Sequence, residues 1–224
     1  MTTALRAAWL IAAKDLRTEF RSRELVYTTL FFGMACVLVF AFAFAAPSGD
    51  AIAGVLWIAV LFSGTVALGR TFERERQNET LRALLLAPVE RGAVYLGKLI
   101  GLMILLGGLE LVLVPIIGIL FTAPVGRAPW LLAGLLLSGT LGFAAVGTLF
   151  SAMLSRVQSR DILLPVVLYP LTVPVVIAGV EGTAAIFAAD PRFDVARMWL
   201  AMLIFFDAVF VTLALWTFGA VMRE

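Results

Sequence analysis

Residues 70–92 read RTFERERQNETLRALLLAPVERG, a charged and then leucine-rich stretch between two runs that are almost purely apolar. A segment with a polar and an apolar side that is held between two membrane spans must lie at a membrane surface, where its polar side can meet water or a soluble protein. We therefore expect residues 70–92 to form a candidate docking element at one membrane face.

The composition is that of an integral membrane protein. Of the 224 residues, 62% are hydrophobic and 14% are charged, whereas a soluble domain is about half apolar and about a quarter charged. Histidine is absent and Cys36 is the single cysteine, so the chain cannot form an internal disulfide and has no CxxC or zinc pattern. Any metal chemistry would therefore come from a partner.

Six stretches are long and apolar enough to cross a bilayer, which takes about 20 residues of helix. They lie near residues 25–46, 51–69, 94–121, 130–154, 162–180 and 198–221. The third stretch is long enough to tilt or to begin as an interfacial turn around Tyr95 and Lys98. The expected fold is an all-α polytopic membrane protein with a single transmembrane domain over residues 1–224.

The placement of Lys and Arg predicts the orientation. Fourteen of the 17 basic residues fall on the side that holds both termini and residues 70–92, and only Arg127, Arg192 and Arg197 fall on the other. The positive-inside rule then places both termini in the cytoplasm. The net charge of +2 is thus a topology signal, and we expect no nucleic-acid partner.

The N-terminal residues 1–24 precede the first span and contain an amphipathic pattern. An apolar stripe recurs at three- and four-residue steps, and most basic residues lie off it; the stripe consists of Leu5, Trp9, Ala12, Leu16 and Phe20. This pattern predicts a helix lying in the cytoplasmic interface. A signal peptide is the alternative, but the apolar run 7–13 is short and no cleavage-like site follows it.

Residues 92–98, GAVYLGK, match the first seven positions of a P-loop. The next residue is Leu99, where the motif requires a Ser or Thr hydroxyl for Mg²⁺, and no strand precedes the match. The preferred interpretation is a snorkelling Lys98 above a close-packing Gly97-xxx-Gly101 face. We expect no nucleotide site in this chain.

Two spans carry unusual local patterns. In 130–154, small residues form a stripe that predicts close packing against another helix. The sequence does not decide whether that helix belongs to this chain or to another subunit. The members of the stripe are Gly134, Ser138, Gly142, Gly147, Ser151 and Ser155. In 162–180, Pro165, Pro170 and Pro174 each delete a backbone donor, so neighbouring helices, a hydroxyl such as Thr172 or a water-lined cavity must satisfy the freed carbonyls. That span is a candidate pathway element, and a purely structural kink is the alternative.

Two acids are isolated inside spans. Placing an acid in mid-bilayer costs about 3 kcal/mol on insertion scales, so Glu110 and Asp207 should be protonated, paired or water-facing. From the expected helix ends both lie roughly 10–15 Å below the outer face. We hypothesise that they line one polar crevice together; structural hydrogen-bonded acids are the alternative. Residues 181–197 form an external loop, in which the short apolar run 182–189 could be a re-entrant hairpin.

The docking segment has two sides if it is helical. Phe72 and the leucines give a membrane-facing side, and the charged residues give a wetted one. The candidate docking residues are Phe72, Glu73, Arg74, Glu75, Arg76, Glu79, Arg82 and Leu85. The alternating charges of residues 73–76 could also be an ordinary solvated helix face.

Three stretches carry a resemblance to a known family. They read GVLWIAVLFSGTVALGRTFERE, LRALLLAPVERGAVYLGK and LPVVLYPLTVPVVI, and span order and length agree as well. Together they resemble the heme exporter protein B family (CcmB), the ABC-2 type permease of the cytochrome c maturation system. The resemblance covers nearly the whole chain.

The resemblance implies a transporter subunit of the bacterial inner membrane, not an enzyme. A pair of these permeases would bind two copies of a cytoplasmic ATPase that holds ATP and Mg²⁺, with further membrane subunits that handle heme. The docking residues would then contact the ATPase. Met103, Met153 and Tyr169 are weak axial ligands in principle but are interpreted as packing residues.

Other classes share these features. A permease of the same architecture could move a lipid, polysaccharide or drug. An ATP-independent carrier would be expected to show ion-coupling sites and often an internal repeat, and no clear repeat is present. A pure assembly anchor is disfavoured by the proline-rich span and the buried acids.

Overall fold

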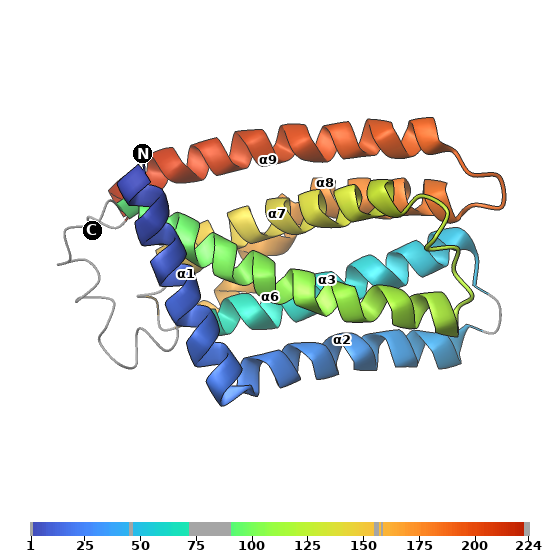
Figure 1. Cartoon of the computed structure of the whole chain (residues 1–224), viewed down its shortest axis with the longest axis horizontal. Helices are drawn as coiled ribbons and strands as arrows, with labels where there is room; N and C mark the ends of the chain where they lie inside the picture. The colour runs from blue at the N-terminus through green and yellow to red at the C-terminus, as the bar shows by residue number, and fades with distance from the viewer. Residues whose placement is uncertain (1, 45–46, 72–90, 155–156, 158, 222–224) are drawn as a thin grey trace.

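The computed structural model describes residues 2–44, 47–71, 91–154, 157 and 159–221. Within these residues the chain forms seven helices and no strand (Figure 1). They are α1 (Thr2–Ser22), α2 (Glu24–Ala43), α3 (Gly49–Thr71), α6 (Arg91–Leu120), α7 (Pro129–Met153), α8 (Arg160–Phe187) and α9 (Phe193–Val221).

The six predicted spans are confirmed. Among the described residues, α2, α3 and α6 to α9 are each long and apolar enough to cross a bilayer. They run side by side along the long axis of the molecule, and the start of α1 and the end of α9 lie at the same end of the bundle (Figure 1). The protein is therefore an all-α, multi-pass membrane protein.

The core lies around α3 and α7, the two spans that are most buried inside the bundle. Trp57 of α3 fills notches left by two glycines: a Cβ on Gly139 of α7 would lie 2.2 Å from its ring, and one on Gly179 of α8 would lie 2.4 Å from it. The indole Nε1 donates a 3.0 Å hydrogen bond to Thr183 Oγ1 of α8. A single aromatic side chain thus joins three helices.

The small-residue stripe of α7 packs within this chain, against three neighbouring helices. Gly134 lies against Leu200 of α9, and Ser138 donates a hydrogen bond to Asp207 of the same helix. Further along α7, Ser151 donates to the backbone oxygen of Leu68 in α3 at 3.1 Å. Over the described part of the stripe, the partners that the sequence left undecided are therefore sister helices: α9, α3 and, at Gly142, also α8, whose Val175 would lie 3.1 Å from an added Cβ. Ser155 lies outside the described residues.

The fifth span is longer than predicted, and the proposed re-entrant hairpin is wrong. α8 continues as one helix to Phe187, so residues 182–187 are its last turns and only residues 188–192 connect it to α9. These turns are apolar because they are buried inside the bundle. Gly182 packs against Leu135 of α7 and Trp199 of α9, which allows α8 to approach both helices closely.

A one-residue corner separates α1 from the first span. Arg23 adopts a left-handed conformation with φ 57°, and the backbone hydrogen bonds Arg23 N to Glu19 O and Tyr27 N to Arg23 O continue across it. The corner lets α1 lie across the end of the bundle, where it packs on α6 (Figure 1). The predicted N-terminal helix is present, and its membrane placement stays a prediction.

The predicted apolar stripe of α1 is divided between two environments. Its large members Leu5, Trp9 and Phe20 are largely exposed, whereas Ala12, also a member, is fully buried together with Ala8. The large apolar side chains point away from the bundle because small residues allow the closest approach of two helices.

Lys98 does not snorkel to the surface as predicted. Its side chain is 2% exposed and its Nζ lies 2.7 Å from Asp15 Oδ2 of α1, so the ammonium is held beneath α1. Residues 92–98 are helical, which agrees with the rejection of a P-loop. The close-packing role predicted for Gly97 is confirmed against α1, whereas Gly101 has no neighbour within 4 Å of an added Cβ.

Candidate functional site

The predicted docking residues lie outside the described residues, because the segment from Phe72 to Leu85 falls within the gap 72–90. The structure does describe both flanks of that gap. α3 ends at Thr71 and α6 begins at Arg91, at the end of the bundle that also carries α1 and the end of α9 (Figure 1).

Polar contacts join each flank to another helix. Arg70, near the end of α3, pairs with Glu24 at the start of α2. Arg91, the first residue of α6, donates a 2.8 Å hydrogen bond to the backbone oxygen of Gly219 in α9. Tyr95 packs against Phe218 one turn further in, with ring centroids 5.4 Å apart. Residues 70–92 are therefore connected at both ends to the bundle.

The two intramembrane acids do not face one another. Thr140 of α7 donates a hydrogen bond to Glu110 Oε1 of α6, and Ser138 of α7 donates one to Asp207 Oδ2 of α9. Ser138 and Thr140 are two residues apart, which places them on different sides of α7. Each acid thus ties its own helix to α7, and the hypothesis of one shared crevice is not supported by this arrangement.

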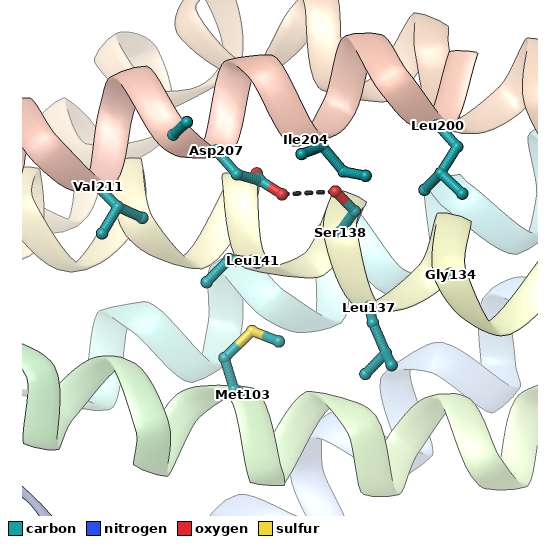
Figure 2. Close-up of a pocket in the computed structure, with 10 residues that line it drawn as sticks. Met103, Gly134, Leu137, Ser138, Leu141, Leu200, Ile204, Asp207 and Val211 are labelled. Carbon is teal, nitrogen blue, oxygen red and sulfur yellow. Dashed lines mark hydrogen bonds between the residues drawn. The ribbon is translucent and has the colours of Figure 1, made fainter. Parts of the chain in front are cut away.

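An open groove lies between α6 and α9, with α7 as its floor. α6 and α9 are joined near Arg91 and Gly219. Further from that end, Met103 of α6 lies across from Leu137 and Leu141 of α7, and the Ser138–Asp207 hydrogen bond lies on the α9 side (Figure 2). The groove has a volume of about 600 Å³ and its lining is almost entirely apolar.

The depths of the two acids differ more than the sequence predicted. Glu110 is 10 residues from the end of α6, or about 15 Å at 1.5 Å per residue. Asp207 is 14 residues from the start of α9, or about 21 Å. The value for Asp207 is larger than predicted because α9 begins at Phe193 rather than near residue 198. Only Asp207 lines the groove.

The three prolines lie inside the continuous helix α8. Pro170 is exposed, Pro165 and Pro174 are half-buried, and none of them lines the groove. The Thr172 hydroxyl donates to the backbone oxygens of Leu168 and Tyr169. Pro170 has no backbone N–H to donate to the carbonyl four residues before it. That carbonyl is neither of the two that Thr172 contacts. A role of α8 in a pathway stays a prediction.

Sequence reasoning missed the partners of the buried acids. The sequence pattern assigns no role to Thr140, and it assigns Ser138 only to helix packing. Buried acids need hydrogen-bond partners. The signal available in the sequence is that two hydroxyl side chains lie close together in the span 130–154, while two other spans each carry an isolated acid. The pairing of Asp15 with Lys98 has no comparable signal, because the two residues are 83 positions apart in the sequence.

The described residues contain no group of three or more Asp, Glu, His or Cys that could hold a metal ion. The three side chains that are weak axial ligands in principle lie apart. Met103 lines the groove, Met153 is exposed at the end of α7, and Tyr169 of α8 packs edge-on against Phe62 of α3.

Comparison with known proteins places the chain in a family. The profile of the family described as CcmB protein matches residues 6–224. This chain belongs to the CcmB family. The match includes most of α1, residues 72–90 and all six spans, so CcmB membership applies to the whole membrane domain.

Several CcmB relatives are similar over most of their length. The heme exporter protein B of Paracoccus denitrificans is 33% identical over 171 residues, which are 75% of this chain and 73% of the relative. The protein of the same name from Rhodobacter capsulatus is 31% identical over 176 residues, 76% and 79% of the two chains. That of Pseudomonas aeruginosa is 26% identical over 199 residues, 87% of each.

Proposed function

We propose that this CcmB family protein is the membrane permease subunit of an ABC transporter complex for cytochrome c biogenesis. The complex would couple ATP hydrolysis to the export of heme or to the release of a heme-loaded chaperone. The observation that carries the proposal is the family match over residues 6–224, together with relatives that are named heme exporter protein B.

The energy source in this proposal is a separate cytoplasmic ATPase, which holds the ATP and Mg²⁺. Heme is handled by the complex and its other membrane subunits rather than ligated by this chain. The permease works as a homodimer in the bacterial inner membrane, with both termini in the cytoplasm. Among the described residues, the excess of Lys and Arg at the end of the bundle that carries α1 supports this orientation.

Force would enter through residues 70–92. Nucleotide binding can shift the permease only if the ATP-bound and ATP-free partners dock differently on it. The contacts at the flanks support such a role, because Arg70 reaches α2 and Arg91 reaches α9. Movement of the segment would then act on both sides of the bundle.

The proposal is tested in a bacterium whose own copy of the gene is deleted. The triple variant Arg74→Glu, Arg76→Glu, Glu79→Arg should abolish covalent heme attachment to cytochrome c, while the purified complex still hydrolyses ATP. Arg197→Glu is the matched control, because this exposed arginine lies near the start of α9, at the opposite end of the bundle. Wild-type levels of cytochrome c in the triple variant would remove the segment from the mechanism.

A second experiment identifies the cargo class. The protein is purified in mild detergent and the co-purifying proteins are identified by mass spectrometry. An ATPase together with heme-binding membrane proteins supports the proposal. An ATPase that comes with proteins of lipid, polysaccharide or drug export contradicts the assignment to heme, and purification with no ATPase contradicts the ABC transporter class.

A further inference from the structure

The contact between α1 and α6 is closer than a helix resting on a membrane surface requires. A Cβ on Gly97 of α6 would lie 2.8 Å from the backbone oxygen of Ala8 and 2.8 Å from the Cβ of Ile11. Ala8 and Ala12 have no exposed surface. The two backbones therefore meet directly at the glycine, and a larger residue at position 97 would push α1 away from α6.

A buried charge lies next to this contact. Lys98 is 2% exposed, and its Nζ is 2.7 Å from Asp15 Oδ2, whose side chain is 23% exposed. Asp15 continues the α1 stripe of Ala8 and Ala12 by about one turn, so the pair and the glycine contact lie on the same face. A buried ammonium has a large desolvation penalty unless it is paired, so the position of Lys98 strongly favours one register of α1 on α6.

The contact with α1 lies close to the start of α6, the helix that follows the docking segment. Lys98 is seven residues after Arg91, or about 10 Å along the helix, and residues 70–92 lead directly into this part of α6. α1 is thus bound to the first two turns of the helix that follows the docking segment. At the other end α1 continues through the Arg23 corner into α2.

We propose that α1 and the first two turns of α6 move as one rigid body, with Lys98 as the positioning residue that joins them. Force on residues 70–92 then reaches α1, and through it α2, rather than α6 alone. This inference rests on the proposed function, because it assigns a route to the force that the partner ATPase supplies. The competing view is that α1 is a passive surface anchor that slides independently of α6.

The physical joint is tested without any activity measurement. In a Cys36→Ser background, Ala12→Cys reports whether α1 is seated, because Ala12 is fully buried. Lys98→Met should raise the rate of maleimide labelling at this cysteine by about tenfold or more, as expected when local opening becomes easier. Lys98→Arg keeps the charge and should label slowly. Equal labelling in Lys98→Met and the parent would overturn the proposal.

Function is then measured in the full complex as the ratio of cytochrome c matured to ATP hydrolysed. Lys98→Met and Asp15→Asn should each lower this ratio, and the double variant should be no worse than the more affected single one, because both remove the same link. Lys98→Arg should restore it. Gly101→Ala is the matched control, since an added Cβ there meets nothing within 4 Å.

The failure of this inference is distinguishable from failure of the proposed function. If the function is right and the inference is wrong, the charge reversal at residues 74, 76 and 79 lowers the ratio while Lys98→Met leaves it unchanged. If the docking segment plays no part, the charge reversal has no effect, and the labelling of Ala12→Cys still decides whether α1 is clamped.

Discussion

At the scale of single residues, the bundle depends on large side chains set into glycine notches. Trp57 is the clearest case, because Gly139 and Gly179 leave room for its indole from two different helices. The hydrogen bond to Thr183 then fixes the orientation of the ring. Since hydrophobic driving force between helices is weak in lipid, such close packing and such a hydrogen bond account for much of the association.

We predict that Gly139→Ala destabilises the protein. Its Cβ would lie 2.2 Å from the Trp57 ring, and overpacking of this kind costs about 1–3 kcal/mol. The measurement is the thermal midpoint in detergent, which should fall. Gly54→Ala in α3 is the control, because an added Cβ there has no neighbour within 4 Å. Equal thermal midpoints for the two variants would contradict the close fit of Trp57 against Gly139.

The buried acids yield a second prediction. Asp207→Asn keeps the size of the side chain and a hydrogen-bond partner for Ser138, whereas Asp207→Leu removes it and should cost about 1–2 kcal/mol. Glu110→Gln and Asp207→Asn should act additively on the thermal midpoint, because each acid bonds a different hydroxyl. Strong non-additivity would instead indicate a shared polar crevice.

At the scale of elements, α7 holds its neighbours in place. Ser138 connects it to α9, Thr140 connects it to α6, and Ser151 connects it to α3. α8 behaves differently, because it remains one helix despite three internal prolines. Continuity across prolines is possible in a membrane where neighbouring groups satisfy the freed carbonyls.

We predict opposite effects on stability and activity for Pro170→Ala. Alanine restores a backbone donor within α8 and removes the clash of the proline ring, so the thermal midpoint should rise. If α8 lines a pathway or bends during transport, maturation of cytochrome c should fall in the same variant. A raised midpoint with full maturation would leave the kink as a purely structural feature.

At the scale of the whole molecule, the bundle has two ends that carry different segments of the chain. α1, the end of α3 and the start of α6 lie at one end, and the connections 121–128 and 188–192 lie at the other (Figure 1). The exposed Trp130 at the start of α7 and Trp216 near the end of α9 are well placed to mark the two interfaces, where tryptophan is enriched.

The orientation is testable by labelling. In a Cys36→Ser background, Gly126→Cys should react with an impermeant maleimide added to intact spheroplasts, and Ser22→Cys should react only after the membrane is opened. Both positions are exposed in the protein, so lack of reaction reports the membrane side. The reverse pattern would place α1 outside and contradict docking to a cytoplasmic ATPase.

The sequence alone determined the membrane class, the six spans, the presence of an N-terminal helix and the family. These follow from local properties, namely the length of apolar runs, the period of the pattern and the identity of short stretches. A span is apolar whichever helix it meets, so its existence can be read without knowing its neighbours.

Which helix surfaces meet is visible only in the folded bundle. Ala12 of the α1 stripe packs on the bundle while the large members of the stripe are exposed, Lys98 is paired rather than snorkelling, and residues 182–187 are buried helix rather than a hairpin. Glu110 and Asp207 likewise went to opposite sides of α7. In a bundle where nearly every side chain is apolar, one face of a helix looks like another. The neighbour is chosen by close fit at glycines and by a few polar pairs between residues far apart in the chain.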